Sequence, residues 1–288
     1  MIKKRIFTFW ENTKGTHMPA YINMCMETWV KNIPGLELVV LNFDNLFDWL
    51  DEDYVKKSDF KRVSLAQAKD IISYGIIYKH GGIFLDADTI AVKDIFDELE
   101  LMDEEKLYLF GSDKTKNVHL GALFCGEPYN KALLECISRA KLAVKNNKRL
   151  LSKNTAYRLA RNIIINGRTV LKGGKLSFQG YMPWHYFGNS VLDPIAKDIG
   201  FKDLLNIIDR NCSGAILEAQ YFNSGAREDY LKFYFTSNNI SVQEAINKAC
   251  FGLICLHNSW TPNMYKSYTR ERIMNDDVLL SKMLTHLM

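Results

Sequence analysis

Two carboxylates stand one residue apart at the end of an apolar run. The segment 83–85 (Ile-Phe-Leu) leads into Asp86 and Asp88, and it follows the pair Gly81-Gly82. In a β-strand, residues i and i+2 point to the same side, so Asp86 and Asp88 present oxygen atoms toward one hard cation. An acidic turn with Asp88 as a helix N-cap is the alternative interpretation. An unpaired carboxylate at the rim of a buried sheet is costly, and this favours a cation as its partner.

Strands and amphipathic helices alternate through the first ninety residues and must position these carboxylates. We predict strands over 6–10, 36–41 and 83–85, and helices over 21–31 and about 63–79. Gly81 then fits the residue that follows a helix C-terminus. This alternation predicts a mostly parallel sheet with ligands at the carboxyl ends of its strands. Trp10, Asp44, Asp86 and Asp88 fall at or just past those ends.

The remainder of the chain has a less regular pattern. Strands are expected over 107–111 and 122–125, and helices over 128–145 and around 154–166. A buried strand over 251–256 ends at His257. The tail over 269–288 is expected to form an amphipathic helix with Ile273, Leu280, Met283, Leu284 and Leu287 on its apolar side.

Composition sets the class of protein. A chain of 288 residues with 47% hydrophobic content can bury the core of one large domain, or of one domain with a subdomain. Its apolar runs are too short for a signal peptide or for a spanning helix of roughly 20 residues, so we expect a soluble, cytoplasmic protein. The six cysteines form no C-x-x-C pair, which favours buried free thiols.

Positive charge is concentrated in one stretch. Eleven of the 37 Lys and Arg residues lie between Cys136 and Leu192, where there is no Asp or Glu. Such a block is typical of a surface for polyanions such as anionic lipid headgroups or a pyrophosphate, and the alternative is a set of solvated helix faces. No nucleic-acid partner is predicted, because no helix-turn-helix, zinc-finger or RNP-type pattern accompanies the charge.

Several motifs together resemble a known family. They are Met18-Pro19, the helix with Cys25-x-Glu27-Thr28-Trp29, the helix with Asp70, and Tyr78-x-x-Gly81-Gly82-Ile83-Phe84-Leu85-Asp86-x-Asp88-Thr89. This pattern is similar to the capsular polysaccharide synthesis glycosyltransferases, which are related to the D-x-D group that includes the catalytic domains of clostridial glucosylating toxins. The likeness covers roughly residues 3 to 97 and returns at 257–260. It implies a GT-A fold, a single Rossmann-like α/β domain with additional helices in the C-terminal half.

The resemblance also implies a reaction. Relatives transfer a hexose from a nucleotide-sugar with retention of anomeric configuration and use Mn²⁺ or Mg²⁺. A UDP-sugar donor and a glycan acceptor, linked to a polyprenyl pyrophosphate in capsular or surface polysaccharide synthesis, are therefore expected. The basic segment 136–192 would then hold a metal-dependent hexosyltransferase at the inner face of the plasma membrane as a peripheral protein. Residues 1–110 would bind the donor. The part over 111–268, with a closing strand at 251–257, would bind the acceptor and precede the helix at 269–288.

Residue roles follow from the same resemblance. Asp86 and Asp88 would be catalytic metal ligands, Asp86 would also contact the donor, and His257 would be a third metal ligand. Imidazole suits Mn²⁺ better than Mg²⁺, although a core histidine is the alternative for His257. The donor-binding residues would be Phe9, Trp10, Asp70, Asp86 and Trp260, with Trp10 stacking on uracil.

Each of these donor-binding roles has a plainer alternative. Phe9 and Trp10 would serve equally as core aromatics, and Asp70 as a carboxylate on a helix surface. Relatives place an arginine three residues after the Asp at position 70, where this chain has Ser73. A lysine such as Lys69 or Lys114 would then have to hold the phosphate or the sugar.

Two rival functions share the local pattern. A haloacid-dehalogenase-type phosphatase would use Asp86 as its nucleophile, because the segment 83–89 also fits its strand-D-x-D-x-T motif. That fold starts with this strand, whereas some 80 residues precede it here, and the later acidic pair would have to be Asp276-Asp277. A catalytically silent sugar-binding protein is the other rival, and Ser73 favours it.

Overall fold

A six-stranded sheet forms the centre of the molecule. The computed structural model describes residues 4–12, 17–60, 63–99, 103–112, 117–146, 186–209, 227–236, 240–249 and 251–288, together with Gly167 and Leu171. The strand order is β2-β1-β3-β6-β5-β7. These strands are β1 (Arg5–Phe9), β2 (Glu37–Leu41), β3 (Gly82–Leu85), β5 (Leu107–Ser112), β6 (Asn117–Cys125) and β7 (Leu205–Asp209).

The sheet is mostly parallel. Strand β1 runs parallel to β2 and β3, and β5 runs parallel to β7. Strand β6 lies between β3 and β5 and is antiparallel to both. Residues of β3 are buried throughout, as expected for a strand covered on both faces. The predicted α/β class, with a mostly parallel central sheet, is confirmed.

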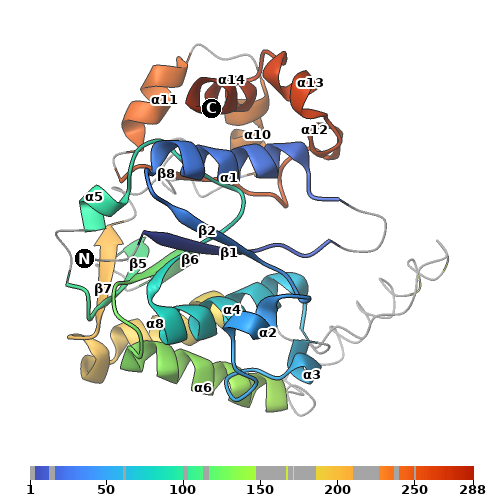
Figure 1. Ribbon diagram of the computed structural model, residues 1–288. Coiled ribbons are helices and arrows are strands. Elements are labelled where there is room, and N and C mark those ends of the chain that lie inside the picture. The colour runs from blue at the N-terminus through green and yellow to red at the C-terminus, as the bar shows by residue number, and fades with distance from the viewer. Residues whose placement is uncertain are drawn as a thin grey trace.

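Helices cover both faces of this sheet (Figure 1). The lower layer contains α2 (Leu46–Trp49), α3 (Lys57–Phe60), α4 (Leu65–His80), α6 (Lys131–Asn146) and α8 (Val191–Lys197). The upper layer contains α1 (Ala20–Asn32), α10 (Arg227–Phe235), α11 (Val242–Lys248), α12 (Asn263–Lys266), α13 (Arg270–Met274) and α14 (Leu279–Leu287). Each interface has its own cluster of buried apolar side chains. Most of the C-terminal helices therefore lie beside α1, which is close to the N-terminus of the chain.

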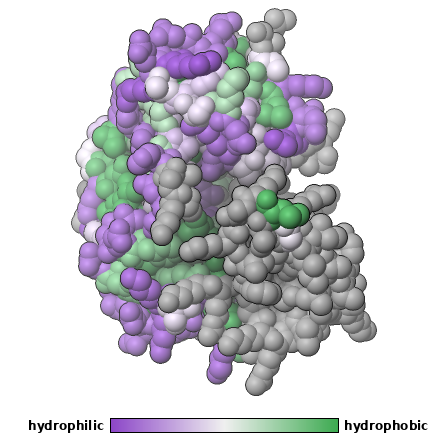
Figure 2. All heavy atoms as spheres, turned by 90° about the vertical axis from the view of Figure 1, so that its right-hand side faces the viewer, coloured by the Kyte–Doolittle hydropathy of each residue, from purple (hydrophilic) through white to green (hydrophobic). Residues whose placement is uncertain are grey.

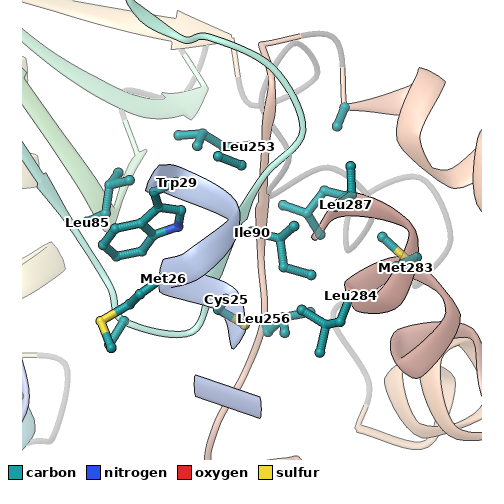
Figure 3. Close-up of a cluster of buried hydrophobic side chains, with 14 of the residues drawn as sticks. Cys25, Met26, Trp29, Leu85, Ile90, Leu253, Leu256, Met283, Leu284 and Leu287 are labelled. Carbon is teal, nitrogen blue, oxygen red and sulfur yellow. The ribbon is translucent and has the colours of Figure 1, made fainter. Parts of the chain in front are cut away.

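A second, two-stranded sheet joins distant parts of the chain. Strand β4 (Thr89–Ala91) pairs antiparallel with β8 (Leu253–Cys255). On the other side of β4, side chains of α1 bond its backbone: the indole N–H of Trp29 donates to the Thr89 carbonyl at 2.6 Å. Figure 3 shows Ile90 between α1 and α14, with Trp29 near Leu85. The buried polar groups of β4 thus have partners on both edges, which fixes the chain just after Asp88.

Helix α4 has defined signals at both ends. Ser64 and Gln67 form a reciprocal capping box at its start. It ends at Gly81, as predicted, where φ is 62°. A Cβ atom at Gly81 would lie 2.6 Å from the Gly126 carbonyl oxygen, so only glycine fits this close approach. The chain turns there into β3 and carries Asp86 to the end of the strand.

The C-terminal tail differs from the prediction. Residues 269–288 form two helices, α13 and α14, instead of one, and Asn275 caps the first while Val278 begins the second. The break replaces a straight helix by two short ones that wrap the core, so the apolar residues predicted for this tail are all buried. The predicted helices at 154–166 and most of the basic segment 136–192 lie outside the described residues.

Two expectations from composition can be compared with the described part of the chain. Cys25, Cys125, Cys136 and Cys255 are buried free thiols, as predicted, while Cys212 and Cys250 lie outside the described residues. None of the helices in the described ranges has the length and apolar character needed to cross a bilayer.

Candidate active site

The carboxyl ends of β1 and β3 open into a pocket of about 360 Å³. Its lining comes from four separate segments: Phe9, Trp10 and Glu11; Leu65, Ala66 and Lys69; Asp86, Ala87 and Asp88; and Asn258. Figure 2 shows the side of the molecule toward which β1 runs, with hydrophobic atoms at the height of the sheet and hydrophilic atoms over the upper layer. Trp10, Asp86 and Asp88 lie together at the strand ends, as predicted, whereas Asp44, after β2, is exposed and is not among the lining residues.

The C-terminal segment holds Asp88 in place. A carboxylate oxygen of Asp88 accepts a hydrogen bond from the Asn258 backbone N–H at 2.7 Å. The side-chain oxygen of Asn258 in turn accepts from the Tyr21 hydroxyl at 2.6 Å. Burial raises the pKa of Asp88 to about 6, and the charge of Asp86 raises it too, against the lowering effects of the Asn258 N–H and His257. The two carboxylates therefore repel each other across the pocket.

Lys69 bridges the other two carboxylates. Its ammonium lies 2.7 Å from an Asp86 oxygen and 3.0 Å from an Asp70 oxygen. Burial favours the neutral amine, yet Asp70 and Asp86 outweigh it and raise the pKa of Lys69. Burial raises the pKa of Asp70 to about 6, because a single ammonium shared by two carboxylates compensates each only in part. Asp70 thus lies behind Lys69 and does not line the pocket.

The donor atoms suit a divalent cation that is shared with a substrate. Asp86 and Asp88 supply hard oxygen ligands, and a cation would favour the ionised form of Asp88, whose pKa is raised by burial and by the charge of Asp86. No group of three or more His, Cys, Asp and Glu side chains within the described ranges is arranged to hold a metal by itself. Mg²⁺ and similar ions are commonly held by one or two carboxylates plus substrate phosphates, so two carboxylates fit that mode of binding.

His257 and Trp260 lie beside the pocket and not among its lining residues. Their rings stack at a centroid distance of 4.2 Å, and both contact the buried Tyr230. His257 is close enough to Asp88 for its charge to lower the pKa of that carboxyl. Metal ligation by His257 and donor contact by Trp260 stay predictions.

The two aromatic residues at the end of β1 differ in exposure. Phe9 is 7% exposed and packs edge-on against Phe43. Trp10 is half-buried, and its indole N–H donates to the Asn12 side chain at 3.2 Å. Both line the pocket, but Trp10 presents the larger accessible surface for stacking.

Ser73 is buried and is not among the residues that line the pocket. The Ser73 hydroxyl donates to the Asp70 carbonyl one turn earlier at 2.8 Å. Lys69 is the one basic side chain among the described residues that line the pocket. A second cation, Lys266 of α12, is near enough for Asp88 to raise its pKa, although burial, the larger effect, lowers it. Lys114 lies outside the described residues.

Sequence reasoning missed several contributors to the site. Glu11 directly follows Trp10 at the end of β1, and this position was a usable signal. The backbone N–H of Asn258 carries no signature in a sequence.

The acidic pair that a phosphatase would need lies in the turn before α14, where Asp277 is exposed and pairs with Lys282 at 2.7 Å.

Fold and pocket together define an α/β protein with an acidic, metal-compatible pocket at the carboxyl ends of its parallel strands. The chain belongs to the capsular polysaccharide synthesis protein family, whose model matches residues 1–151. The resemblance deduced from the D-x-D segment is thereby confirmed. The description of this family assigns it to capsular polysaccharide synthesis. No curated protein sequence matches the chain.

The chain has weak structural similarity to several solved glycosyltransferases. The chain is similar to the PaToxG glycosyltransferase (14% identity, TM-score 0.40, 99% of this chain and 86% of that one). It is also similar to GlyE of Streptococcus pneumoniae TIGR4 (13%, 0.42, 99% of this chain and 63% of that one). The ligand-free glycosyltransferase domain of the YGT toxin follows (9%, 0.46, 100% and 99%). These identities and TM-scores are too low to transfer an activity from those proteins to this one.

Proposed function

We propose that this chain is a metal-dependent retaining hexosyltransferase that takes its sugar from a nucleotide-sugar, specifically a UDP-sugar. The observation that carries the proposal is the pocket at the ends of β1 and β3, which joins an accessible Trp10 to the carboxylate pair Asp86 and Asp88. Its volume of about 360 Å³ falls within the range of small-molecule sites. A base stacked on Trp10 would direct the diphosphate toward the carboxylates.

The pocket also contains groups suited to a diphosphate. Leu65 and Ala66 are in the first turn of the 16-residue helix α4, where backbone N–H groups lack intrahelical acceptors and the helix dipole favours anions. Lys69 adds a positive charge one turn further on. A divalent cation, held by Asp86 and Asp88, would neutralise charge that develops on the leaving phosphate.

The residues around the carboxylates would keep the reacting groups in place. The Asn258 N–H orients Asp88, and the Tyr21 hydroxyl orients Asn258. We favour a same-face reaction in which the leaving phosphate accepts the proton of the acceptor hydroxyl. The acceptor we propose is a glycan on a polyprenyl pyrophosphate. The enzyme would meet it in the cytoplasm, at an anionic membrane surface that the basic segment 136–192 would contact.

A donor panel tests this function. Purified wild-type protein is mixed with individual nucleotide-sugars and Mn²⁺, and nucleotide release is measured for the wild type and Asp88→Ala. We expect UDP release with at least one UDP-sugar and a loss of at least about 100-fold in Asp88→Ala. Asp277→Ala, which removes an exposed carboxylate outside the pocket, is the matched control and should retain wild-type rates.

Two further outcomes discriminate between mechanisms. Phosphate release from phosphomonoesters without UDP release would favour the phosphatase with Asp86 as nucleophile. An inverted anomeric configuration in the product, determined by NMR, would contradict the retaining mechanism while leaving sugar transfer intact.

A further inference from the structure

Lys69 lies between two carboxylates that differ in their exposure to solvent. Asp70 is its neighbour on α4, and the Asp70 side chain is 10% exposed, so that ion pair is enclosed by the fold. Asp86 comes from the end of β3, its side chain is 32% exposed, and it faces the pocket. The same ammonium thus neutralises a buried acid on one side and a site carboxylate on the other.

Acidic side chains outnumber basic ones among the described residues that line the pocket. Glu11, Asp86 and Asp88 line the cavity with Lys69 as the one described base among them, so the lining is acidic before any substrate enters. A lysine at Asp86 competes with a divalent cation for the same oxygen atoms. An incoming diphosphate, in contrast, needs positive charge, and Asp86 already takes one hydrogen bond of the Lys69 ammonium.

We propose that Lys69 is an internal counter-ion that exchanges partners as the site fills. In the empty site Lys69 holds Asp86, and it yields Asp86 when a divalent cation binds to the carboxylate pair. The ammonium, still anchored by Asp70, then pairs with a phosphate oxygen of the nucleotide. This inference rests on the proposed function, and it assigns Asp70 as the positioning residue for Lys69.

The geometry supports the exchange. The 2.7 Å and 3.0 Å contacts leave the ammonium within one hydrogen-bond length of both acids, so release of Asp86 needs only a rotation of the flexible lysine stem. Leu65 and Ala66, one turn earlier on α4, lie on the same wall of the pocket. Lys69 and the first turn of α4 therefore approach one anion from the same side.

Removal of the ammonium should change metal and nucleotide affinity in opposite directions. Lys69→Met should bind Mn²⁺ alone about tenfold more tightly than wild type, since a competing cation is gone. In saturating Mn²⁺ it should bind UDP about tenfold more weakly, since a charged donor to phosphate is lost. Calorimetric titration gives both dissociation constants without any need for turnover.

Three further variants control for effects on ligand affinity other than the loss of the Lys69 ammonium. Lys69→Arg keeps the charge and should shift both affinities less than Lys69→Met does. Lys69→Met/Asp70→Asn removes the buried acid that the single variant leaves uncompensated, and it should show the same opposite shifts. Lys79→Met removes a lysine from the same helix whose partner is the surface residue Asp51, and it should change neither affinity.

Each result has a distinct meaning. Unchanged or weaker Mn²⁺ binding in both Lys69→Met variants, or unchanged UDP binding, would overturn the exchange of partners while leaving the proposed function standing. A wild-type protein that binds neither Mn²⁺ nor UDP would instead refute the proposed function itself.

Discussion

Asp70→Asn offers a direct test of how one ammonium is shared between two acids. Asp70 is 7% exposed, and burial raises its pKa from an ordinary 3.8 to about 6 despite the neighbouring Lys69. Asparagine keeps the size of the side chain and cannot ionise. Lys69 also pairs with Asp86 at 2.7 Å in the wild type, so the substitution leaves the ammonium one carboxylate partner. The main difference in pH dependence between the two proteins is therefore expected from the Asp70 carboxyl.

The sign and size of the effect follow from linkage. Because the folded-state pKa is the higher one, the folded protein binds the proton more tightly between about pH 4 and pH 6. The free energy of unfolding of the wild type should thus increase as the pH falls through 6, relative to Asp70→Asn. A shift from 3.8 to about 6 corresponds to ~3 kcal/mol in total, of which about 2 kcal/mol should be gained between pH 7.5 and pH 4.5.

Urea unfolding of both proteins at pH 7.5, 6.0 and 4.5, in EDTA, measures this difference. The stability of wild type minus that of Asp70→Asn should rise at each step toward acid. A difference that stays constant, or that falls toward acid, would refute the reasoning. Such a result would mean that Lys69 compensates Asp70 fully and has less charge left for Asp86 than the 2.7 Å contact indicates.

Two predictions concern the elements that carry the site. Gly81→Ala should lower the free energy of unfolding by about 3 kcal/mol or more, because the new Cβ would lie 2.6 Å from the Gly126 carbonyl oxygen at a φ of 62°. Gly35→Ala is the control, because Gly35 has a φ of 77° but open space around it, and it should lower the free energy of unfolding by only about 1 kcal/mol in the same urea titration. Equal losses would contradict the packing argument. Trp29→Phe should lower the free energy of unfolding by about 1–3 kcal/mol, because the buried Thr89 carbonyl loses its 2.6 Å indole donor. An unchanged unfolding midpoint would show that this bond does not hold β4.

The first ninety residues were the most predictable part of the fold. Helices α1 and α4 and strands β1 to β3 lie within about two residues of their predicted bounds, since each has strong local periodicity and Gly81 ends α4. Long-range pairing was not predictable in the same way. Nothing local in 117–125 specifies that β6 inserts antiparallel between β3 and β5, and nothing local in 253–255 selects β4 as its partner.

The residues of the site also differ in whether local sequence features could predict them. Trp10, Asp86 and Asp88 were predictable because the carboxyl ends of parallel strands meet, and all three line the pocket. Lys69 and Asp86 lie seventeen positions apart and come together only when α4 packs beside β3. Asn258 contributes through its backbone, which no residue-type pattern can reveal.

The position of Asp88 depends on parts of the chain beyond the matched family region. The family model ends at residue 151, yet Asn258 binds the Asp88 carboxylate, and β8 pairs with the strand that follows it. Strand β4 in turn packs between α1 and α14 (Figure 3). A substitution in α14 would therefore reach Asp88 through β4 and not through the pocket. The C-terminal layer is then a structural component of the site, because it sets where the Asp88 carboxylate lies relative to Asp86.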